Sequence, residues 1–334
     1  METNIKVTLS DIAQKLNFSI VTVSKALRDH PDISTKTKER IKRTAVELGY
    51  TPNYLARSLA AKRSHTIGLV VPQISNYFYP AIIKSIYDAT FKIKYDVLLT
   101  VSYEDAEREK LHLESLMSKR VDGLLVSISE TTTDSSLFRK IKKLGFPLVF
   151  FDRTVDDTDF SSVKIDDRKA AFKAVEHAIE KGYKKIAHFA GSSNIDIGRQ
   201  RLEGFLTAME SYNIPVNDDW IIECGFSKQY GYNAFLKIFK TGLLPEIIFT
   251  VGFSVALGVY TAATEVGIRI PEDIDLIFIG DGQINPFASR SLSCVSSPVK
   301  ELGEESVKLL MNHIDNPESA EIQQVILEAE LINY

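Results

Sequence analysis

The sequence predicts an α/β protein with two unlike parts: a small helical head, and a larger body of two lobes with doubly wound parallel sheets. Residues 1–63 are dense in helix signals, and only residues 7–9 resemble a strand. From residue 65 onward, short apolar runs alternate with amphipathic segments, which indicates parallel strands covered by helices on both faces. This alternation occurs twice, with a break near residues 152–163, and therefore predicts two lobes.

The composition indicates a soluble globular protein of two or three domains. The chain has 334 residues, 44% of them hydrophobic and 25% charged. Its longest apolar runs are too short to span a bilayer, and its first residues contain no apolar core of signal-peptide length. The two cysteines, Cys224 and Cys294, lie in no metal-binding or disulfide pattern. We therefore expect a cytoplasmic, nucleoid-associated protein without membrane contact.

The head is expected to contain three helices. Thr8 or Ser10 can cap a first helix through residues 11–16, Ser19 a second over 20–28, and Ser34 a third that ends at Gly49. Apolar residues recur on these helices at spacings of three and four, which predicts one small shared core. They are Ile12, Ala13, Leu16, Val23, Leu27, Ile41, Ala45 and Leu48.

The first two of these helices form a predicted helix-turn-helix, because about three turn residues separate them. In this motif the second helix enters the major groove of DNA by its N-terminal end. Ile20 and Val21 would then contact thymine methyl groups. The alternative is that both are core residues, but the helical spacing assigns Val23 and Leu27 to the core. Thr22 and Ser24 can reach phosphates, and the next residue, Lys25, a guanine edge or a phosphate.

Charge supports the same interpretation. Residues 1–63 carry 12 Lys and Arg against 6 Asp and Glu, a net charge of +6 in a chain whose total is −4. The remainder therefore carries −10. A basic head on an acidic body favours a polyanionic partner, although a solvated charged helix face would have the same composition. Residues 55–61 form a short predicted helix, marginal alone in water, and we interpret it as a conditional hinge.

The body contains eight predicted strands and six predicted helices in alternation. The strands lie near residues 66–71, 95–101, 122–127, 147–152, 184–191, 219–225, 246–252 and 273–280. The helices lie near residues 78–94, 105–119, 167–181, 198–212, 228–240 and 254–267. In such folds a ligand binds at the C-terminal ends of the strands.

Catalysis is less well supported than binding. We find no GxGxxG after a strand, no GxxxxGK[ST], no GxSxG and no HExxH. The six histidines form no triad or metal-ligand spacing. We expect no catalytic residue, no cofactor and no metal. A cytosolic binding protein or enzyme with a vestigial head remains the alternative.

Several motifs resemble the LacI/GalR family of bacterial transcriptional regulators. They include "TVSKAL", "LGYTPN", "LARSLAAKRSHTIGLVVP", "RVDGLLV", "GRQRLEGF", "VALGVY" and "IPEDIDLI", and they span essentially the whole chain. The resemblance implies a helix-turn-helix head (residues 1–49), a hinge helix (50–63) and a body like periplasmic sugar-binding proteins (64–334). We expect a first lobe of about 64–163 and 294–321, and a second of about 164–293 and 322–334.

The resemblance also implies a homodimeric, allosteric repressor that reads a pseudo-palindromic double-stranded DNA operator under the control of a small molecule. The expected DNA-binding residues are Thr8, Ser19, Ile20, Val21, Thr22, Ser24, Lys25, Arg28, Ser34, Asn53, Ala56, Arg57 and Leu59. Leu59 matches the hinge leucine that wedges into the minor groove, as apolar kinking residues do. Packing of Leu59 against its own head is the alternative. No leucine heptad follows the last strand, so a dimer is the default.

The resemblance also implies an effector pocket, whose residues are identified by matching single positions of this sequence to the family's pocket positions. The expected positions are Asn76, Tyr77, Phe78, Asp152, Arg201, Phe226, Phe253 and Asp281. Aromatic faces with Arg and Asp suit a sugar-like effector, whereas each aromatic residue alone is also compatible with core packing. Many relatives have Asn-Asp where this chain has Gly252-Phe253, so Phe253 either stacks on the ligand or fills the space. A second departure is Phe278-Ile279. A nucleobase or a protein partner stays open as the effector, as does the choice between inducer and co-repressor.

Overall fold

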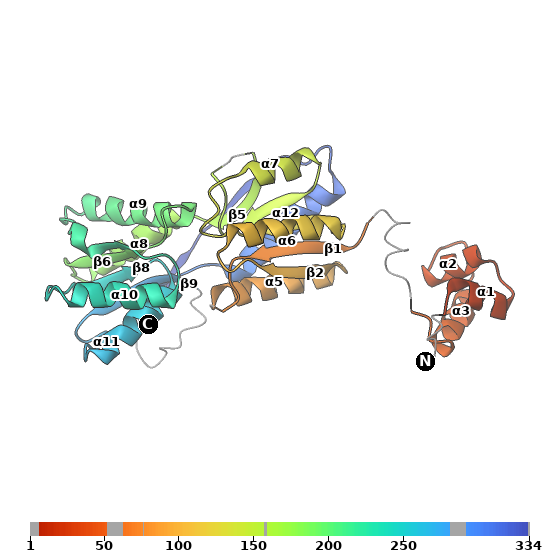
Figure 1. Ribbon diagram of the computed structural model, residues 1–334, viewed down its shortest axis with the longest axis horizontal. Coiled ribbons are helices and arrows are strands. Elements are labelled where there is room, and N and C mark those ends of the chain that lie inside the picture. Colours follow the sequence, from red (N-terminus) through yellow and green to blue (C-terminus); the bar gives the residue numbers. More distant parts are fainter. Residues whose placement is uncertain (1–6, 52–62, 76, 157–158, 281–291, 333–334) are drawn as a thin grey trace. The chain divides into compact units, whose positions relative to one another are not determined.

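A computed structural model describes residues 7–51, 63–75, 77–156, 159–280 and 292–332 (Figure 1). The chain divides into two compact units, Met1–Ser64 and His65–Tyr334. This boundary lies one residue beyond the end of the expected hinge. The head and the body are treated separately below.

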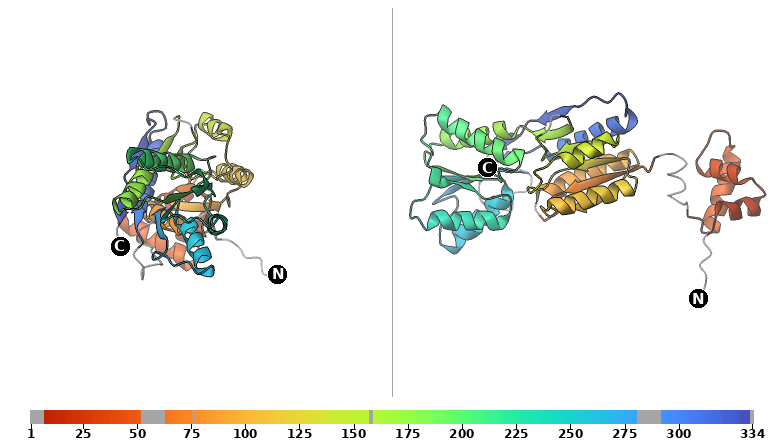
Figure 2. Two further views of the ribbon diagram at one scale, coloured as in Figure 1. Left: turned by 90° about the vertical axis from the view of Figure 1, so that its left-hand side faces the viewer. Right: turned by 45° about the horizontal axis from the view of Figure 1, so that its top comes forward.

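The described part of the head consists of helices α1 (Leu9–Leu16), α2 (Ile20–Leu27) and α3 (Thr35–Glu47), visible in the right-hand view of Figure 2. Residues 7–9, which resemble a strand in sequence, do not form one, because Leu9 already begins α1. Thr8 caps that helix: its backbone N–H and its hydroxyl both donate to Oδ2 of Asp11, each at 2.7 Å. This reciprocal cap stabilises helix at the point where β-branched residues favour a strand.

The predicted head core is confirmed. Its central side chains, Ile12, Val23 and Ile41, are fully buried. Leu16, Leu27 and Leu48 are partly buried and pack against them. The three-residue turn between α1 and α2 is also confirmed, and Asn17 within it adopts the left-handed conformation that ends α1.

The first lobe of the body has a parallel sheet with the strand order β11-β5-β4-β3-β1-β2. Its strands are β1 (Thr66–Val71), β2 (Asp96–Val101), β3 (Gly123–Val126), β4 (Leu148–Phe151), β5 (Ser161–Ile165) and β11 (Gln324–Leu327). Helices α5 (Phe78–Lys92) and α12 (Val299–Asp315) share a core with one face, and α6 (Ala106–Ser118) and α7 (Ser136–Lys143) with the other.

The second lobe has a sheet with the order β12-β10-β9-β8-β6-β7, in which β12 alone runs antiparallel to its neighbour. Its strands are β6 (Ile186–Ala190), β7 (Ile221–Glu223), β8 (Ile247–Thr250), β9 (Asp275–Gly280), β10 (Cys294–Ser296) and β12 (Glu330–Ile332). Its helices are α8 (Asp167–Glu180), α9 (Asp196–Ser211), α10 (Lys228–Phe239) and α11 (Phe253–Glu265), with a 3₁₀ turn, η1, at Asp218–Trp220. Figure 1 shows α8 and α9 on one side of this sheet and α10 and α11 on the other.

The eight expected strands are confirmed, but two strands near the C-terminus belong to the other lobe than the one expected for them. Strand β10, assigned to the first lobe, pairs with β9 in the second. Strand β11, assigned to the second lobe, pairs with β5 in the first. The described chain passes between the sheets after β5, after β10 and after β11. The sheet that a C-terminal strand joins depends on which sheet has an edge strand free to pair with it. The composition of the strand does not indicate which sheet this is.

The loops at the C-terminal ends of the strands position the candidate site. Three non-glycine residues there, Tyr103, Glu104 and Asp152, have φ angles of 53°, 61° and 59°. This left-handed conformation is uncommon outside glycine and collects at functional sites. Among the described residues, no helix is both long and apolar enough to cross a membrane.

Candidate DNA-binding surface and ligand pocket

The N-terminal end of α2 presents apolar side chains to solvent. Ile20 is 50% exposed and Val21 is 65% exposed, whereas Val23 is fully buried. Ser19 caps the helix, since its Oγ accepts from the backbone N–H of Thr22 at 3.0 Å. The Thr22 hydroxyl lies 2.8 Å from the same oxygen. The cap therefore fixes the helix end from which an exposed apolar pair projects.

Two of the expected DNA-contacting cations have partners within the head. Nζ of Lys25 lies 2.7 Å from a carboxylate oxygen of Asp32, and Nε of Arg28 donates to the carbonyl oxygen of Ser24 at 3.2 Å. Both side chains of the Lys25–Asp32 pair are accessible to solvent, and such pairs contribute little stability. A phosphate can therefore replace Asp32 as the partner of Lys25 at small cost.

The other expected DNA-binding residues divide into two groups. Thr8 and Ser34 cap α1 and α3, and Ser34 accepts from the backbone N–H of Thr37 at 3.3 Å. Exposed helix N-termini of this kind bind phosphate oxygens through backbone N–H groups. Asn53, Ala56, Arg57 and Leu59 lie outside the described residues.

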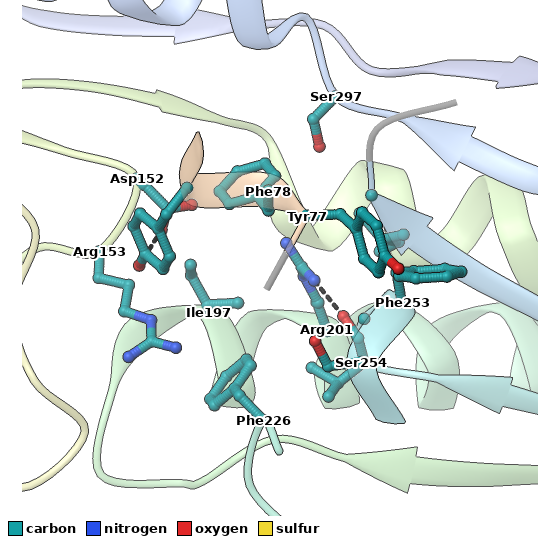
Figure 3. Close-up of a pocket in the computed structure, with 15 residues that line it drawn as sticks. Tyr77, Phe78, Asp152, Arg153, Ile197, Arg201, Phe226, Phe253, Ser254 and Ser297 are labelled. Atoms are coloured by element: carbon teal, nitrogen blue, oxygen red, sulfur yellow. Dashed lines mark hydrogen bonds between the residues drawn. The ribbon is translucent and has the colours of Figure 1, made fainter. Parts of the chain in front are cut away.

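A cavity of about 70 Å³ lies in the body, with walls from both lobes (Figure 3). Six of the eight expected effector positions line it: Tyr77, Phe78, Asp152, Arg201, Phe226 and Phe253. Asn76 and Asp281 lie outside the described residues. Nine further lining residues were not among the expected positions: Tyr79, Arg153, Ile197, Val251, Gly252, Ser254, Ile279, Gly280 and Ser297. Tyr79, Arg153 and Ser254 each directly follow an expected position in the sequence, and this adjacency could have identified them.

Arg201, on α9, is held in place by the second lobe. Its Nε donates to Oδ1 of Asp167 at 2.7 Å, and its Nη1 donates to the carbonyl oxygen of Val251. Both charged side chains are buried. Burial raises the pKa of Asp167, and the guanidinium beside it opposes that shift. The pairing orients Arg201 so that its remaining N–H groups are available to a ligand in the cavity.

Asp152 and Arg153, at the end of β4, belong to a buried polar network. The Tyr79 hydroxyl donates to Oδ2 of Asp152 at 2.7 Å, and burial raises the pKa of this carboxyl group. Nη1 of Arg153 lies 2.8 Å from a carboxylate oxygen of Glu104. The guanidinium carbon of Arg153 also lies 4.4 Å from the ring centroid of Phe226, which belongs to the second lobe. This cation–π contact joins the two walls of the cleft.

Phe253 fills space at one end of the cavity. Its ring packs edge-to-face against Tyr77 of the first lobe, with centroids 5.1 Å apart, and against Phe278 at 5.3 Å. Only 8% of Phe253 is exposed. The two departures from the family pattern, Phe253 and Phe278, therefore belong to one aromatic cluster, of which Phe253 lines the cavity.

Ser297 lies where the chain passes from β10 to α12. It is 3% exposed, and its Oγ has no hydrogen-bond partner among the described residues. Figure 3 shows this hydroxyl directed toward the cavity. An unpartnered buried hydroxyl is costly, and a ligand hydroxyl or an ordered water would satisfy it.

Comparisons with known proteins match both units. Residues 8–53 match the model of bacterial regulatory proteins of the lacI family. Residues 64–333 match the model of periplasmic binding proteins and the sugar-binding domain of the LacI family. The second model covers most of the chain.

Curated and solved proteins show the same likeness over nearly full length. Catabolite control protein A of Priestia megaterium is 29% identical over 92% of this chain and 93% of its own. The transcriptional repressor PurR of Klebsiella pneumoniae is 30% identical over 92% and 91%. The structure of a lac repressor dimer bound to operator and an anti-inducer aligns with a TM-score of 0.86 at 24% identity, over 98% of each chain.

Proposed function

Because this chain belongs to the LacI family, and is therefore a DNA-binding transcription regulator with an effector-binding body rather than an enzyme, we propose a more specific role. It is a homodimeric repressor that acts on the nucleoid in the cytoplasm. Its affinity for a pseudo-palindromic operator is controlled by a carbohydrate, or a carbohydrate derivative, bound between the lobes. The observation that carries the proposal is the pairing of an exposed apolar helix end with a polar, aromatic cavity in one chain.

The head supports operator recognition. Ile20 and Val21 are exposed on a helix whose inward side is already filled by Val23, so they are not needed for the core. Apolar side chains at this end of a recognition helix read thymine methyl groups. The net charge of +6 in residues 1–63 supplies the non-specific attraction to phosphate.

The cavity supports a carbohydrate effector. Sugars present apolar ring faces and many hydroxyl groups, and the walls combine Phe226 and Tyr77 with the polar groups of Arg201, Asp152 and Ser297. The matched family model is described as a sugar-binding domain. Both lobes contribute these groups, so a bound ligand would favour one arrangement of the lobes over another.

An apolar surface on the first lobe supports homodimerisation. Phe91 is 83% exposed on α5, and Tyr87 and Ile93, close to it along the chain, are each about 40% exposed. The Tyr87 hydroxyl donates to the carbonyl oxygen of Val97 at 3.3 Å, and Val97 lies on β2, the edge strand of the first sheet. Exposed large apolar side chains that gather at a sheet edge are typical of an interface, and a second copy of the chain is the proposed partner.

We expect Leu59→Ala to weaken operator binding at least tenfold, because the hinge leucine is proposed to wedge into the minor groove. Effector binding by the body should not change. An electrophoretic mobility shift with the full chain measures the first quantity, and isothermal titration calorimetry the second. Unchanged operator affinity would contradict the wedge role.

The proposal as a whole is tested by selecting DNA sites from a random pool with the full-length protein, followed by footprinting. A two-fold symmetric footprint and a steep fall of affinity with salt are the expected results. Sugars and sugar phosphates are then added to ask which of them changes that affinity, and in which direction. A protein that selects no symmetric site, or whose operator affinity responds to no carbohydrate, would count against the proposal.

A further inference from the structure

The cleft between the lobes contains a second, larger compartment beside the cavity of Figure 3. It has a volume of about 550 Å³ and shares Tyr77, Phe226 and Ser254 with the inner cavity. Its remaining walls come from loops after β1, β2 and β3 in the first lobe, and from α10, α11 and the loop before α10 in the second. They are Gln73, Ser75, Tyr103, Glu104, Glu130, Ser227, Lys228, Gln229, Tyr230 and Leu257.

The two compartments differ greatly in size. Pockets that enclose small organic ligands occupy roughly 300–1,000 Å³. The outer compartment falls within that range, whereas the inner cavity, at about 70 Å³, holds only a few waters' volume. The aromatic cluster of Tyr77, Phe253 and Phe278 narrows the inner cavity. A sugar of two or more rings therefore does not fit in the inner cavity alone and would extend into the outer compartment.

A partition separates the two compartments and joins the lobes. The Arg153 guanidinium lies over the Phe226 ring at 4.4 Å, and Glu104 accepts from it at 2.8 Å and 3.0 Å. Glu104 also accepts from the backbone N–H of Glu130 at 2.9 Å. Arg153 therefore forms part of the partition, and Glu104 neutralises its charge.

The rim of the outer compartment is built at Gly225, which has a φ of 65°. A Cβ atom at this position would lie 3.0 Å from the Tyr230 ring and 3.3 Å from Oε2 of Glu130. The Tyr230 ring of one lobe and the Glu130 carboxylate of the other therefore both approach the space that a Cβ atom of residue 225 would occupy. This close approach needs glycine, and it places an aromatic ring near a hydrogen-bond acceptor.

The opposite wall carries backbone strain. Tyr103 and Glu104 are consecutive residues in the left-handed region, each at a cost of order 1 kcal/mol. Tyr103 is 53% exposed, so burial of its ring does not explain the strain. The turn does present the Tyr103 ring to the compartment and Glu104 to Arg153. Tyr103 from the first lobe and Tyr230 from the second thus line one space, together with Tyr77.

The charges on the walls cancel. Glu104 is paired with Arg153, and the other charged wall residues are one carboxylate, Glu130, and one ammonium group, Lys228. Burial and the neighbouring Glu104 raise the pKa of Glu130. A second negative charge from a phosphate or carboxylate would be disfavoured here, whereas neutral hydroxyl groups suit the Glu130 acceptor and the amide groups of Gln73 and Gln229.

We propose that the outer compartment binds a sugar ring of a neutral di- or oligosaccharide, with Tyr230 and Tyr103 on the ring faces and Glu130 accepting from a hydroxyl group. This inference rests on the proposed function, because it names the kind of carbohydrate that the cleft takes. A single-ring sugar contacts only part of this surface, and a sugar phosphate brings an unfavourable charge.

The experiment uses the full-length protein and isothermal titration calorimetry. The probes are glucose and galactose, the disaccharides cellobiose, maltose and lactose, cellotriose, and glucose 6-phosphate. At least one neutral di- or trisaccharide should bind on the order of tenfold or more tighter than its constituent monosaccharides, and glucose 6-phosphate should not bind tighter than glucose. A disaccharide preference below about twofold for every probe, or tighter binding of the phosphate, overturns the inference.

Variants locate the effect. Tyr230→Ala and Glu130→Ala should each weaken the best di- or trisaccharide about tenfold, because each removes one contact of the outer ring. Tyr212→Ala is the matched control, since Tyr212 is similarly exposed on the same lobe and does not line the compartment. Equal affinity of Tyr230→Ala and Tyr212→Ala for that sugar overturns the assignment.

Operator binding, measured on the same samples, separates this inference from the proposed function. If the operator affinity responds only to monosaccharides, the proposed function stands, but the proposed sugar site in the outer compartment is refuted. If the protein binds no symmetric operator, the proposed function is refuted, whichever sugars the body binds.

Discussion

At the scale of single residues, exposure separates recognition from folding on α2. Ile20 and Val21 are half or more exposed, whereas Val23, in the same helix, has no exposed surface. Removing a buried side chain leaves a cavity, but removing an exposed one does not. Neighbouring residues of the same chemical type therefore have different roles.

We expect exchanging the two residues, by Ile20→Val together with Val21→Ile, to change operator preference more than stability. The exposed methyl groups would move relative to the bases, while the free energy of unfolding of the head changes little. Site selection from random DNA and hydrogen exchange of the head measure the two effects. Val23→Ala is the control: it should destabilise the head by about 2 kcal/mol with no specific change of preference. Equal losses of affinity on all operators would contradict the role in recognition.

His188 is a buried residue that makes stability depend on pH. Its ring stacks between Phe249 and Phe205, with centroids 4.5 Å and 5.1 Å away. Nδ1 lies 3.1 Å from the carbonyl oxygen of Phe249, and Nε2 has no partner among the described residues. Burial lowers the pKa of His188 to about 4. The folded lobe therefore holds this ring neutral.

A lowered histidine pKa means that the unfolded chain binds a proton more readily than the folded one. The contribution of His188 is fully present above the unfolded value of about 6.5 and is lost as the pH falls toward 4. Over that window the free energy of unfolding of the body should fall by roughly 3 kcal/mol more than in His188→Phe, which carries no ionisable ring. Urea unfolding at pH 7, 5.5 and 4 measures this. The control variant His30→Gln, in the exposed surface of the head, should show the same pH dependence as the wild type. If His188→Phe also shows the wild-type pH dependence, this role of His188 is refuted.

At the scale of elements, the N-terminal cap of α2 determines which residues of the head are exposed for DNA recognition. Helix α2 has only eight residues, so its first turn is a large part of its length. Ser19 supplies the capping oxygen at that turn, and the next two residues are the exposed apolar pair. The position of the cap therefore determines which residues face outward.

We expect Ser19→Ala to destabilise α2 by about 1 kcal/mol and to weaken operator binding severalfold, because Thr22 loses its capping acceptor. Hydrogen exchange of the α2 amides in the full chain measures the first effect, and a mobility shift the second. Ser10→Ala is the matched control, since Ser10 is exposed within α1 and is not the residue that caps that helix. A variant whose α2 amides exchange at the wild-type rate would show that the cap is unimportant.

At the scale of the whole body, polar contacts between residues that do not line the outer compartment join the lobes. Asp196, at the start of α9, is buried and accepts from the Thr154 hydroxyl at 2.9 Å and from Nζ of Lys164 at 3.1 Å. Thr154 and Lys164 belong to the first lobe, and Asp196 to the second. The pair of Arg199 and Asp156 lies nearby. These contacts hold the arrangement of the lobes in which the pocket is formed.

We expect Asp196→Asn to destabilise the body by about 3 kcal/mol, because Lys164 is left largely buried without its counter-charge. The effector affinity should fall as well, since fewer molecules hold the two walls together. Thermal unfolding and calorimetry measure these changes. Glu203→Gln is the control, because Glu203 pairs with Arg168 on the exposed surface. An unchanged melting temperature for Asp196→Asn would contradict this role of the contact.

The sequence by itself determined the local features. Capping serines, the three-residue turn and the apolar spacing predicted the head, and alternating apolar runs predicted eight strands, because these signals act between residues close along the chain. Six pocket residues were also predicted from family motifs. Tertiary structure alone decided the placement of β10 and β11, the polar network of Glu104, Arg153 and Asp152, the unpartnered hydroxyl of Ser297 and the outer compartment. Each of these depends on residues far apart in sequence that meet only when two sheets pack, and no local pattern encodes such a meeting.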